Sequence, residues 1–427
     1  MVHSRRLFAG ASVQPFTYQP DTQLAQALHD LDVGALSEYV YHDLPLGRMV
    51  LPALRWILRR HHLDDDAATR QFLREYILSA YKVFQEFTSL VEKTNPQAVV
   101  VFNGMFFPEA VVRWVALCRG IRVLTHEVGF RPFSVFFTDG EATAYPIVIP
   151  ESFTLSPRQN ERLEAYLSQR FKGNFSMAGI RFWPEMRGLD EKILERISQH
   201  KQVVPVFTNV IFDTSQVHAN TVFPHMFAWL EEVLGIIRAH PETLFVIRAH
   251  PDEMRTTKAS RESVRDWVIS HQVDLEPNVI FIDSNEFISS YDLILRSKFV
   301  MIYNSSIGLE AAILGTPVLC GGKARFTQYP IVFFPSSPQA YRQLTEQFLG
   351  AKKIDLPVEF QLNARRFLYY HLYKVSLPFD DFLASDARPG FVRLKEFSWQ
   401  QLLPQQSQVL QIIYAGITEG KPFVMEG

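Results

Sequence analysis

The sequence is poor in cysteine, has no excess of either charge and contains no long apolar run. Its two cysteines, Cys118 and Cys320, stand far apart and form no paired pattern, so we expect two buried, reduced thiols and neither a disulfide framework nor a zinc site. The formal net charge of −2 supplies no cationic field for nucleic acid. No stretch approaches the roughly 18 apolar residues that cross a bilayer, and the N-terminus lacks the apolar core of a signal peptide. These absences predict a cytoplasmic protein that meets a membrane peripherally at most.

What is present is an ordinary globular composition in a chain long enough for more than one core. The 427 residues, of which 47% are hydrophobic and 21% charged, predict two domains. Apolar residues recur three and four positions apart in 49–58 and again in 72–87, which predicts two helices. The spacing of apolar residues then changes. Residues 98–102 (AVVVF) predict a buried strand, residues 108–119 a helix and residues 121–124 a second strand. This order is a βαβ unit.

After a polar, helical bridge at about 150–200, strands and helices alternate regularly. The predicted strands are 202–209, 244–248, 279–282, 299–303 and 317–320, and the predicted helices are 223–239, 261–270, 289–297 and 306–314. Such alternation predicts an open parallel sheet that is wrapped by helices. We therefore predict an α/β fold with domains at 1–190 and 200–350, followed by a C-terminal helical extension at 351–427.

Polar residues follow the predicted strands of the second half, where ligands of open α/β sheets bind. These strand ends are Thr208-Asn209, Arg248 to Pro251, Asp283-Ser284, Asn304 to Ser306 and Gly321-Gly322. The tetrapeptide Arg-Ala-His-Pro occurs twice, and its position separates the copies. The copy at 238–241 closes a helix, so its predicted role is structural. The copy at 248–251 follows a strand, so His250 and Pro251 are predicted to lie at the ligand edge.

A strand-to-helix turn from Asn304 to Glu310 contains two serines and a glycine, Gly308. A serine at a helix start is first of all a cap. Two in succession at the ligand edge also predict N–H groups and hydroxyls that meet a phosphate. Glu310 lies one turn into a largely apolar helix, where it could accept hydrogen bonds from ribose hydroxyls. A plain cap and a solvated glutamate stay open as alternatives.

Together these motifs resemble the donor site of bacterial GT-B transferases that use CMP-sugars, such as sialyltransferases and capsular Kdo transferases. The segment 203–322 is more similar still to the bacterial capsule synthesis family, through TNVIFDTS, FVIRAHPDE, SSYDLI and YNSSIGLEAAILGTPVL. The resemblance is looser over 98–130. It implies two Rossmann-like domains that face a cleft. It also implies a glycosyltransferase that moves a sugar, such as Kdo or a related acidic sugar, from a CMP donor onto a capsular or other surface polysaccharide.

The resemblance further implies roles for single residues. His250 would contact the donor phosphate, Ser305 and Ser306 its oxygens, and Glu310 the ribose, while Asn209 and Asp213 would line the same cleft. The complete predicted donor set is Asn209, Asp213, Arg248, His250, Pro251, Asn304, Ser305, Ser306, Gly308 and Glu310. No metal and no cofactor beyond the nucleotide-sugar is predicted, because the sequence has no DxD motif in a suitable turn and Arg248 or Lys323 could neutralise the phosphate.

Transfer to a hydroxyl needs a base within hydrogen-bond reach of the acceptor. In GT-B enzymes this base usually comes from the N-terminal domain, where Glu127 and the adjacent His126 follow a predicted strand. Glu127 is the first candidate. Asp139 competes with it, because sialyltransferases of this fold place the base in an acidic-acidic-glycine motif and this chain has Asp139-Gly140. The choice between them stays open.

Two other functions stay open as well. One is a CDP-polyol phosphotransferase resembling the teichoic-acid polymerases, which is disfavoured because Tyr303-Asn304 stands where those carry Asp-Tyr before the Ser-Ser pair. The other is a non-catalytic, nucleotide-sugar-binding partner in capsule assembly. The predicted partners are the nucleotide-sugar and a polysaccharide or lipid-linked acceptor, with no nucleic acid. Residues 49–62 form either an interfacial helix at the inner membrane or a core helix with a solvated basic end, and contact with capsule assembly proteins is a further expectation.

Overall fold

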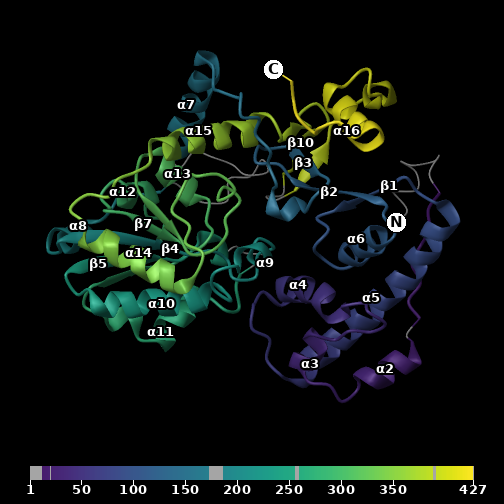
Figure 1. The fold of residues 1–427 in the computed structure, drawn as a ribbon, viewed down its shortest axis with the longest axis horizontal. Coiled ribbons are helices and arrows are strands. Elements are labelled where there is room, and N and C mark those ends of the chain that lie inside the picture. The colour runs from purple at the N-terminus through teal and green to yellow at the C-terminus, as the bar shows by residue number, and fades with distance from the viewer. Residues whose placement is uncertain (1–11, 20, 173–185, 255–258, 388–390, 427) are drawn as a thin grey trace. The chain divides into compact units, whose positions relative to one another are not determined.

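The computed structural model describes residues 12–19, 21–172, 186–254, 259–387 and 391–426 (Figure 1). Contacts divide the chain into two compact units. Unit 1 consists of Met1–Leu54 and Leu63–Val123, and unit 2 of Arg55–His62 and Leu124–Gly427. The predicted domains 1–190, 200–350 and 351–427, and their arrangement around a cleft, stay predictions.

Unit 1 is mainly helical. Its elements are α2 (Thr22–Leu28), α3 (Val33–Ser37), α5 (Ala67–Thr94), β1 (Ala98–Phe102) and α6 (Glu109–Cys118), while α4 (Leu46–Leu58) crosses the division. The carboxylates of Asp21, Asp32 and Asp66 accept backbone N–H groups at the starts of α2, α3 and α5, which explains where these helices begin. The predicted helices and the strand at 98–102 are confirmed, but the predicted burial of this strand is wrong, because Val101 is its one buried residue and Val100 and Phe102 are exposed.

The two free cysteines differ in exposure. Cys320 is buried, as predicted, but Cys118 is exposed, so its predicted burial is wrong. Cys118 shares a helix face with the buried Val111 but is the last residue of α6. Because residues 117–120 are all exposed, the packed part of this helix ends before the cysteine.

Unit 2 is built on a five-stranded, wholly parallel sheet. Its strands are β4 (Gln202–Phe207), β5 (Thr243–Arg248), β6 (Val279–Ile282), β7 (Val300–Ile302) and β8 (Val318–Cys320), in the order β6-β5-β4-β7-β8. This confirms the predicted α/β class and its parallel sheet. Counted within the sheet, the order is 3-2-1-4-5, which is that of a doubly wound fold.

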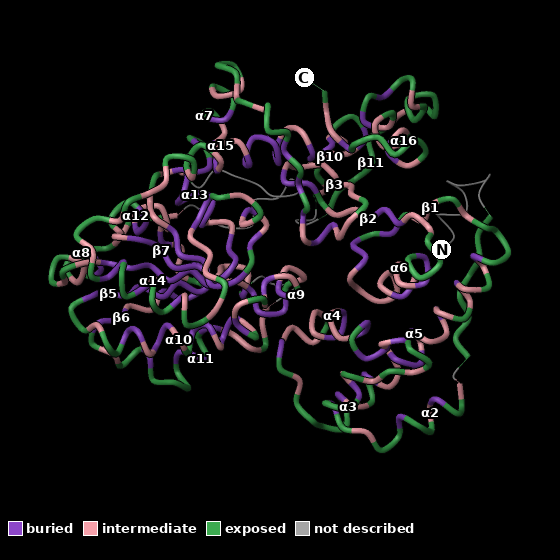
Figure 2. Tube along the Cα trace, in the orientation of Figure 1, coloured by how far each residue is buried: buried purple, intermediate pink, exposed green. Residues whose placement is uncertain are grey.

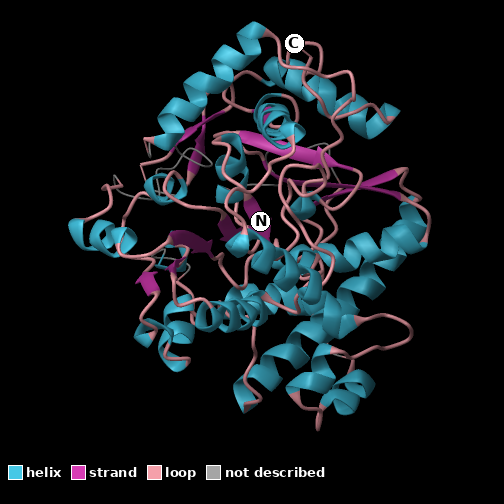
Figure 3. Ribbon diagram, turned by 60° about the vertical axis from the view of Figure 1, so that its left-hand side comes forward, coloured by secondary structure: helices cyan, strands magenta, loops and turns pink. Residues whose placement is uncertain are grey.

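Helices cover both faces of this sheet (Figures 1 and 3). On one face lie α10 (Met226–Ala239), α11 (Val264–Ser270) and α14 (Pro338–Gly350), and on the other lie α8 (Glu191–Ser198), α12 (Ser290–Ile294), α13 (Ile307–Ile313) and α15 (Val358–Tyr373). Alternate residues of β5 divide between the two cores: Phe245 and Ile247 pack on the α10 side, whereas Leu244 and Val246 pack on the α8 and α12 side. The strands are therefore buried along nearly their whole length (Figure 2).

A second ladder, whose strand β2 begins just before the division at Val123 and Leu124, is antiparallel. Strands β2 (Arg122–Val128), β3 (Ser134–Thr138) and β9 (Leu377–Pro378) pair in that order, with Glu127 opposite Phe136 and Val135 opposite Leu377. The predicted strand at 121–124 is thus the start of β2, which continues to Val128. The chain then reverses direction, and β3 pairs with β2.

The chain after residue 350 was predicted to be helical to its end, and this is wrong in part. It contains α15 and α16 (Gln408–Glu419), but also β9, β10 (Leu383–Ser385) and β11 (Val392–Leu394). Such short strands leave no measurable periodicity, and β9 exists because Leu377 finds a partner in the distant β3.

The remaining elements of unit 2 are short or peripheral. They are α7 (Pro157–Phe171), α9 (Gln216–Ala219) and the 3₁₀ turns η1 (Ala142–Ala144), η2 (Pro251–Met254), η3 (Val273–Leu275) and η4 (Trp399–Leu402). Of the helices that the structure describes, none combines the length and the apolar character that a membrane crossing requires.

Candidate functional site

A cavity of about 260 Å³ opens at the carboxyl edge of the parallel sheet. Its position follows from the topology, because the strand order reverses between the neighbouring strands β4 and β7, and doubly wound sheets bind ligands at that point. Six residues of the predicted donor set line it: Asn209, Asp213, His250, Asn304, Ser305 and Ser306. The structure thus brings together polar residues from the ends of three strands.

Asn304 ties these strand ends together. Its Nδ2 donates to Ser215 Oγ at 3.1 Å, and its Oδ1 accepts from Asn209 Nδ2 at 2.8 Å and from Gln216 Nε2 at 3.3 Å. Asn304 is buried. These bonds stabilise the segments after β4 and β7 against each other, so Asn304 and Asn209 organise the cavity wall.

Ser305 and Ser306 lie where the chain passes from β7 to α13. Ser306 occupies the N-cap position of α13, yet its side chain makes no capping hydrogen bond. Ser305 is buried, and its carbonyl oxygen accepts from Gly308 N–H at 3.2 Å. Helix capping therefore does not account for the Ser306 hydroxyl at the cavity.

His250 lines the cavity from the end of β5. Its Nδ1 accepts the N–H of Asp252 at 3.2 Å, so the neutral ring carries its proton on Nε2. Burial lowers the pKa of His250 and is the largest effect, while Asp252 and Asp213 act against it and Arg248 adds to it. His250 can therefore offer a neutral N–H to an anion.

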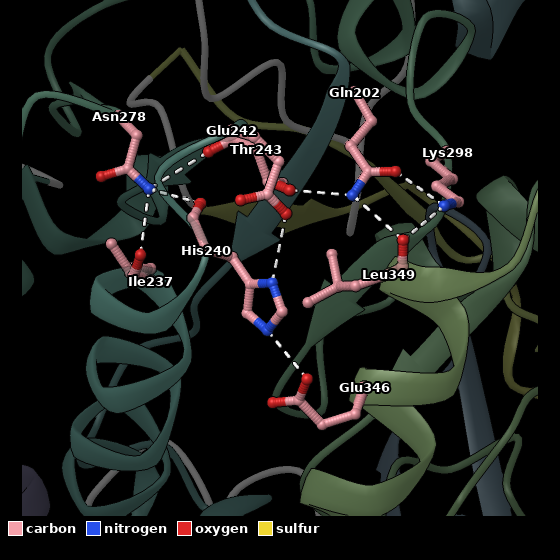
Figure 4. Close-up of polar contacts among 9 residues, drawn as sticks. All are labelled: Gln202, Ile237, His240, Glu242, Thr243, Asn278, Lys298, Glu346 and Leu349. Atoms are coloured by element: carbon pink, nitrogen blue, oxygen red, sulfur yellow. Dashed lines mark hydrogen bonds and ion pairs between the residues drawn. The ribbon is translucent and has the colours of Figure 1, made fainter.

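The other copy of the tetrapeptide, at 238–241, lies at the end of α10, and His240 does not line the cavity (Figure 4). His240 ends α10, and its ring contacts Glu242 Oε1 at 3.2 Å and Glu346 Oε2 at 2.8 Å. Asn278 Nδ2 donates to the carbonyl oxygens of Ile237 and His240, both at 3.0 Å. The prediction that position separates the two copies is confirmed.

Arg248 does not line the cavity, although it was predicted as a donor residue. It continues the β5 face of Leu244 and Val246, and its guanidinium donates to Ser290 Oγ at 3.1 Å and to the Glu286 carbonyl oxygen at 3.0 Å. Burial lowers the pKa of Arg248 to about 10. The side chain of Arg248 thus points to Ser290 and Glu286, whereas His250, which lies beyond the end of β5, lines the cavity.

Gly308 and Glu310 also lie outside the cavity lining. A Cβ on Gly308 would come within 2.3 Å of Ile302 Cδ1, so this glycine lets α13 pack closely on β7. Glu310 is buried in an intramolecular network, in which Oε1 accepts from Arg170 Nε at 2.7 Å and Oε2 from the Tyr291 hydroxyl at 2.5 Å. The predicted ribose contact of Glu310 stays untested, and its described partners are protein groups.

Two cationic side chains also line the cavity. Lys323, which was considered as a phosphate partner, lines it together with Arg325, which was missed. Both follow β8 through Gly321-Gly322, where a Cβ on Gly321 would lie 2.4 Å from Trp229 Nε1. Glycine, which has no Cβ, is therefore the residue that lets the backbone pass this close to Trp229.

Arg325 is held by aromatic rings. Its guanidinium carbon lies 4.1 Å from the Tyr145 ring centroid and 5.6 Å from that of Phe130. Phe130 itself lines the cavity. The polar edge after the strand at 317–320 pointed to this loop, but the rings that orient Arg325 are distant in sequence.

The three predicted base candidates do not line the cavity. His126 stacks on Phe137 with ring centroids 4.9 Å apart, and burial lowers its pKa. Glu127 Oε1 accepts the N–H of Val128 at 2.9 Å. Asp139 is exposed in the turn after β3. Their roles stay predictions without support from position.

A different group of titratable side chains does reach the cavity, and sequence reasoning missed it. Thr143 and His218 both line the cavity, with Thr143 Oγ1 2.8 Å from His218 Nε2. Glu141 Oε2 lies 3.5 Å from His218 Nδ1. The contact between η1 and α9 joins residues 75 positions apart, so no local sequence motif predicts it.

No group of three or more His, Cys, Asp or Glu side chains suited to a metal occurs among the residues that the structure describes. The predicted independence from metals and cofactors stays a prediction.

The fold and cavity define an α/β protein with a candidate ligand site at the switch point of a doubly wound sheet. A family model described as "Capsule polysaccharide biosynthesis protein" matches residues 171–331. This match confirms the resemblance to that family carried by FVIRAHPDE and YNSSIGLEAAILGTPVL. No curated protein matches the chain.

Solved structures resemble the chain at low identity. The beta Kdo 2,4 transferase of Thermosulfurimonas dismutans KpsC is 13% identical, with 66% of this chain and 81% of that chain covered and a TM-score of 0.43. The beta Kdo 2,7 transferase of the same KpsC is 15% identical, with 66% and 79% covered and a TM-score of 0.37. A putative UDP-N-acetylglucosamine 2-epimerase from Listeria monocytogenes is 13% identical, with 75% and 82% covered and a TM-score of 0.31. At these TM-scores the similarities carry no argument about activity.

Proposed function

We propose that this chain is a metal-independent glycosyltransferase of capsule or other surface polysaccharide synthesis. It would move a sugar from a CMP-linked donor onto a polysaccharide or lipid-linked acceptor. The match of residues 171–331 to the capsule family supports the biological setting, and the cavity supports the chemistry.

The observation that carries the proposal is the set of phosphate-binding groups around one cavity. Lys323 and Arg325 bring two cations, His250 a neutral N–H, and Ser305 and Ser306 hydroxyl and backbone groups. When the bond from the sugar to the phosphate breaks, negative charge grows on the leaving nucleotide phosphate. Donors that are oriented beforehand stabilise this charge more in the transition state than in the ground state.

The same cations favour an acidic sugar such as Kdo. A CMP-linked acidic sugar brings a carboxylate as well as a phosphate, and Lys323 and Arg325 could pair with one each. Contact with the inner membrane or with assembly proteins rests on the family setting alone.

The test is nucleotide release. The protein is incubated with CMP-Kdo, a CDP-polyol and a UDP-sugar, and the free nucleotide is quantified for the unmodified chain and for Arg325→Met. We expect CMP release from CMP-Kdo only, and a loss of about 10²–10³-fold in Arg325→Met, the range for removing one transition-state donor. Release of CMP from the CDP-polyol would favour the phosphotransferase, and tight CMP binding without any turnover would favour a non-catalytic partner.

A further inference from the structure

Thr143, His218 and Glu141 form a chain of contacts that ends at the cavity. Thr143 is buried in η1, and His218, whose side chain is 14% exposed, lies on the short helix α9. His218 Nε2 is 2.8 Å from Thr143 Oγ1, and Nδ1 is 3.5 Å from Glu141 Oε2. His250, Ser305 and Lys323 line the same cavity.

The partners of the ring determine which nitrogen is basic. A carboxylate can only accept, so the proton of a neutral His218 is favoured on Nδ1, which faces Glu141. Nε2 then carries the lone pair and accepts from the Thr143 hydroxyl. At 3.5 Å the contact to Glu141 is an ion-pair contact that is longer than a good hydrogen bond.

We propose that His218 is the general base of this site, with Glu141 as its positioning residue. The inference rests on the proposed function and names the group that receives the proton. It replaces a base at Glu127, His126 or Asp139, because those three do not line the cavity whereas His218 does.

The proton and electron balance is complete with the two substrates. The acceptor hydroxyl, or water in donor hydrolysis, gives its proton to His218 Nε2 while its oxygen bonds to the anomeric carbon. The bond from that carbon to the phosphate oxygen breaks, and its electron pair leaves with CMP. Glu141 stabilises the imidazolium that forms, and Lys323 and Arg325 stabilise the departing phosphate.

Hydrolysis of CMP-Kdo by the full chain tests this assignment, with CMP release followed across pH. His218→Gln keeps a side chain that can accept from Thr143 but removes the basic nitrogen. We expect kcat to fall by about 10²–10⁴-fold, the usual worth of a general base, while the affinity for CMP measured by calorimetry is unchanged. His240→Gln is the matched control, since His240 lies outside the cavity, and it should keep full activity.

The pH profile separates a base from a merely structural histidine. The unmodified protein should lose activity at acid pH as His218 takes up a proton, and His218→Gln should lose this acid limb. Glu141→Gln should move the limb to lower pH, because the imidazolium loses its anion. The other titratable groups that line the cavity are Asp213, His250, Asp252, Lys323 and Arg325, and their contribution remains in the His218→Gln profile.

The outcomes are distinct. If the unmodified chain releases no CMP from CMP-Kdo, the proposed function fails. If it does release CMP, but His218→Gln retains both the rate and the acid limb, the base assignment alone is overturned. Loss of CMP affinity together with activity in His218→Gln would also overturn it, because His218 would then bind the donor.

Discussion

At the scale of single residues, position relative to a strand end separates similar motifs. His250 follows β5 and lines the cavity, while His240 ends α10 and contacts Glu242 and Glu346. Position also has a limit as a guide. Arg248 is only two residues from His250, yet its side chain points to Ser290 and Glu286.

The two histidines therefore predict a pair of variants. His250→Ala should weaken CMP binding by about 1.5–3 kcal/mol, the range for a hydrogen bond to a charged group, while His240→Ala should leave it unchanged. Isothermal titration with CMP measures both. Equal losses in the two variants would contradict the placement of the donor phosphate next to His250.

At the scale of elements, the cavity depends on how closely α13 packs against the sheet. Gly308 allows this, since a Cβ there would meet Ile302 Cδ1 at 2.3 Å, the Phe326 ring at 3.2 Å and Val318 at 3.3 Å. Ser305 and Ser306 sit directly before this helix. A shift of α13 would move both serines relative to His250.

Gly308→Ala should accordingly destabilise the protein. Extra volume in a packed contact costs about 1–3 kcal/mol in the free energy of unfolding, and we expect CMP affinity to fall as well because the serines move. Denaturant titration and calorimetry provide the two readouts. Gly350→Ala is the control, because a Cβ on Gly350 meets nothing within 4 Å, and a loss of stability there equal to that of Gly308→Ala would contradict the packing argument.

At the scale of the whole molecule, a buried carboxyl group makes the free energy of unfolding depend on pH. Glu253 is buried beside α11, where its carboxyl accepts the N–H of Val264 at 3.2 Å. Burial raises the pKa of Glu253 to about 8, and this outweighs the hydrogen bond. The folded protein thus holds a proton on Glu253 at pH values where the unfolded chain has released it.

The sign of this effect is definite. With the folded pKa above the unfolded one, the contribution of Glu253 is complete below about pH 4.5 and is lost as the pH rises toward 8, by at most about 1.4 kcal/mol per unit. Urea titrations at pH 5 and pH 8 should show a smaller decrease in Glu253→Gln than in the unmodified chain. Identical decreases in the two proteins would contradict a raised pKa at Glu253.

The sequence by itself determined the features that depend on local pattern. Short apolar runs predicted β1, β5 and the alternation of strands and helices behind the parallel sheet, and strand-end chemistry predicted His250, Asn304, Ser305 and Ser306 at one edge. These predictions hold because neighbouring parallel strands must present their carboxyl ends together.

Tertiary structure decided what depends on distant partners. Glu310 pairs with Arg170, Arg325 packs on Tyr145, β9 pairs with β3, and His218 meets Thr143 and Glu141. Each contact joins segments far apart along the chain, and the direction of a side chain is set by packing that one sequence does not display. For the same physical reason, the cavity-lining residues that follow the strands could be predicted from motifs, whereas the proposed base, His218, is recognisable only in the folded chain.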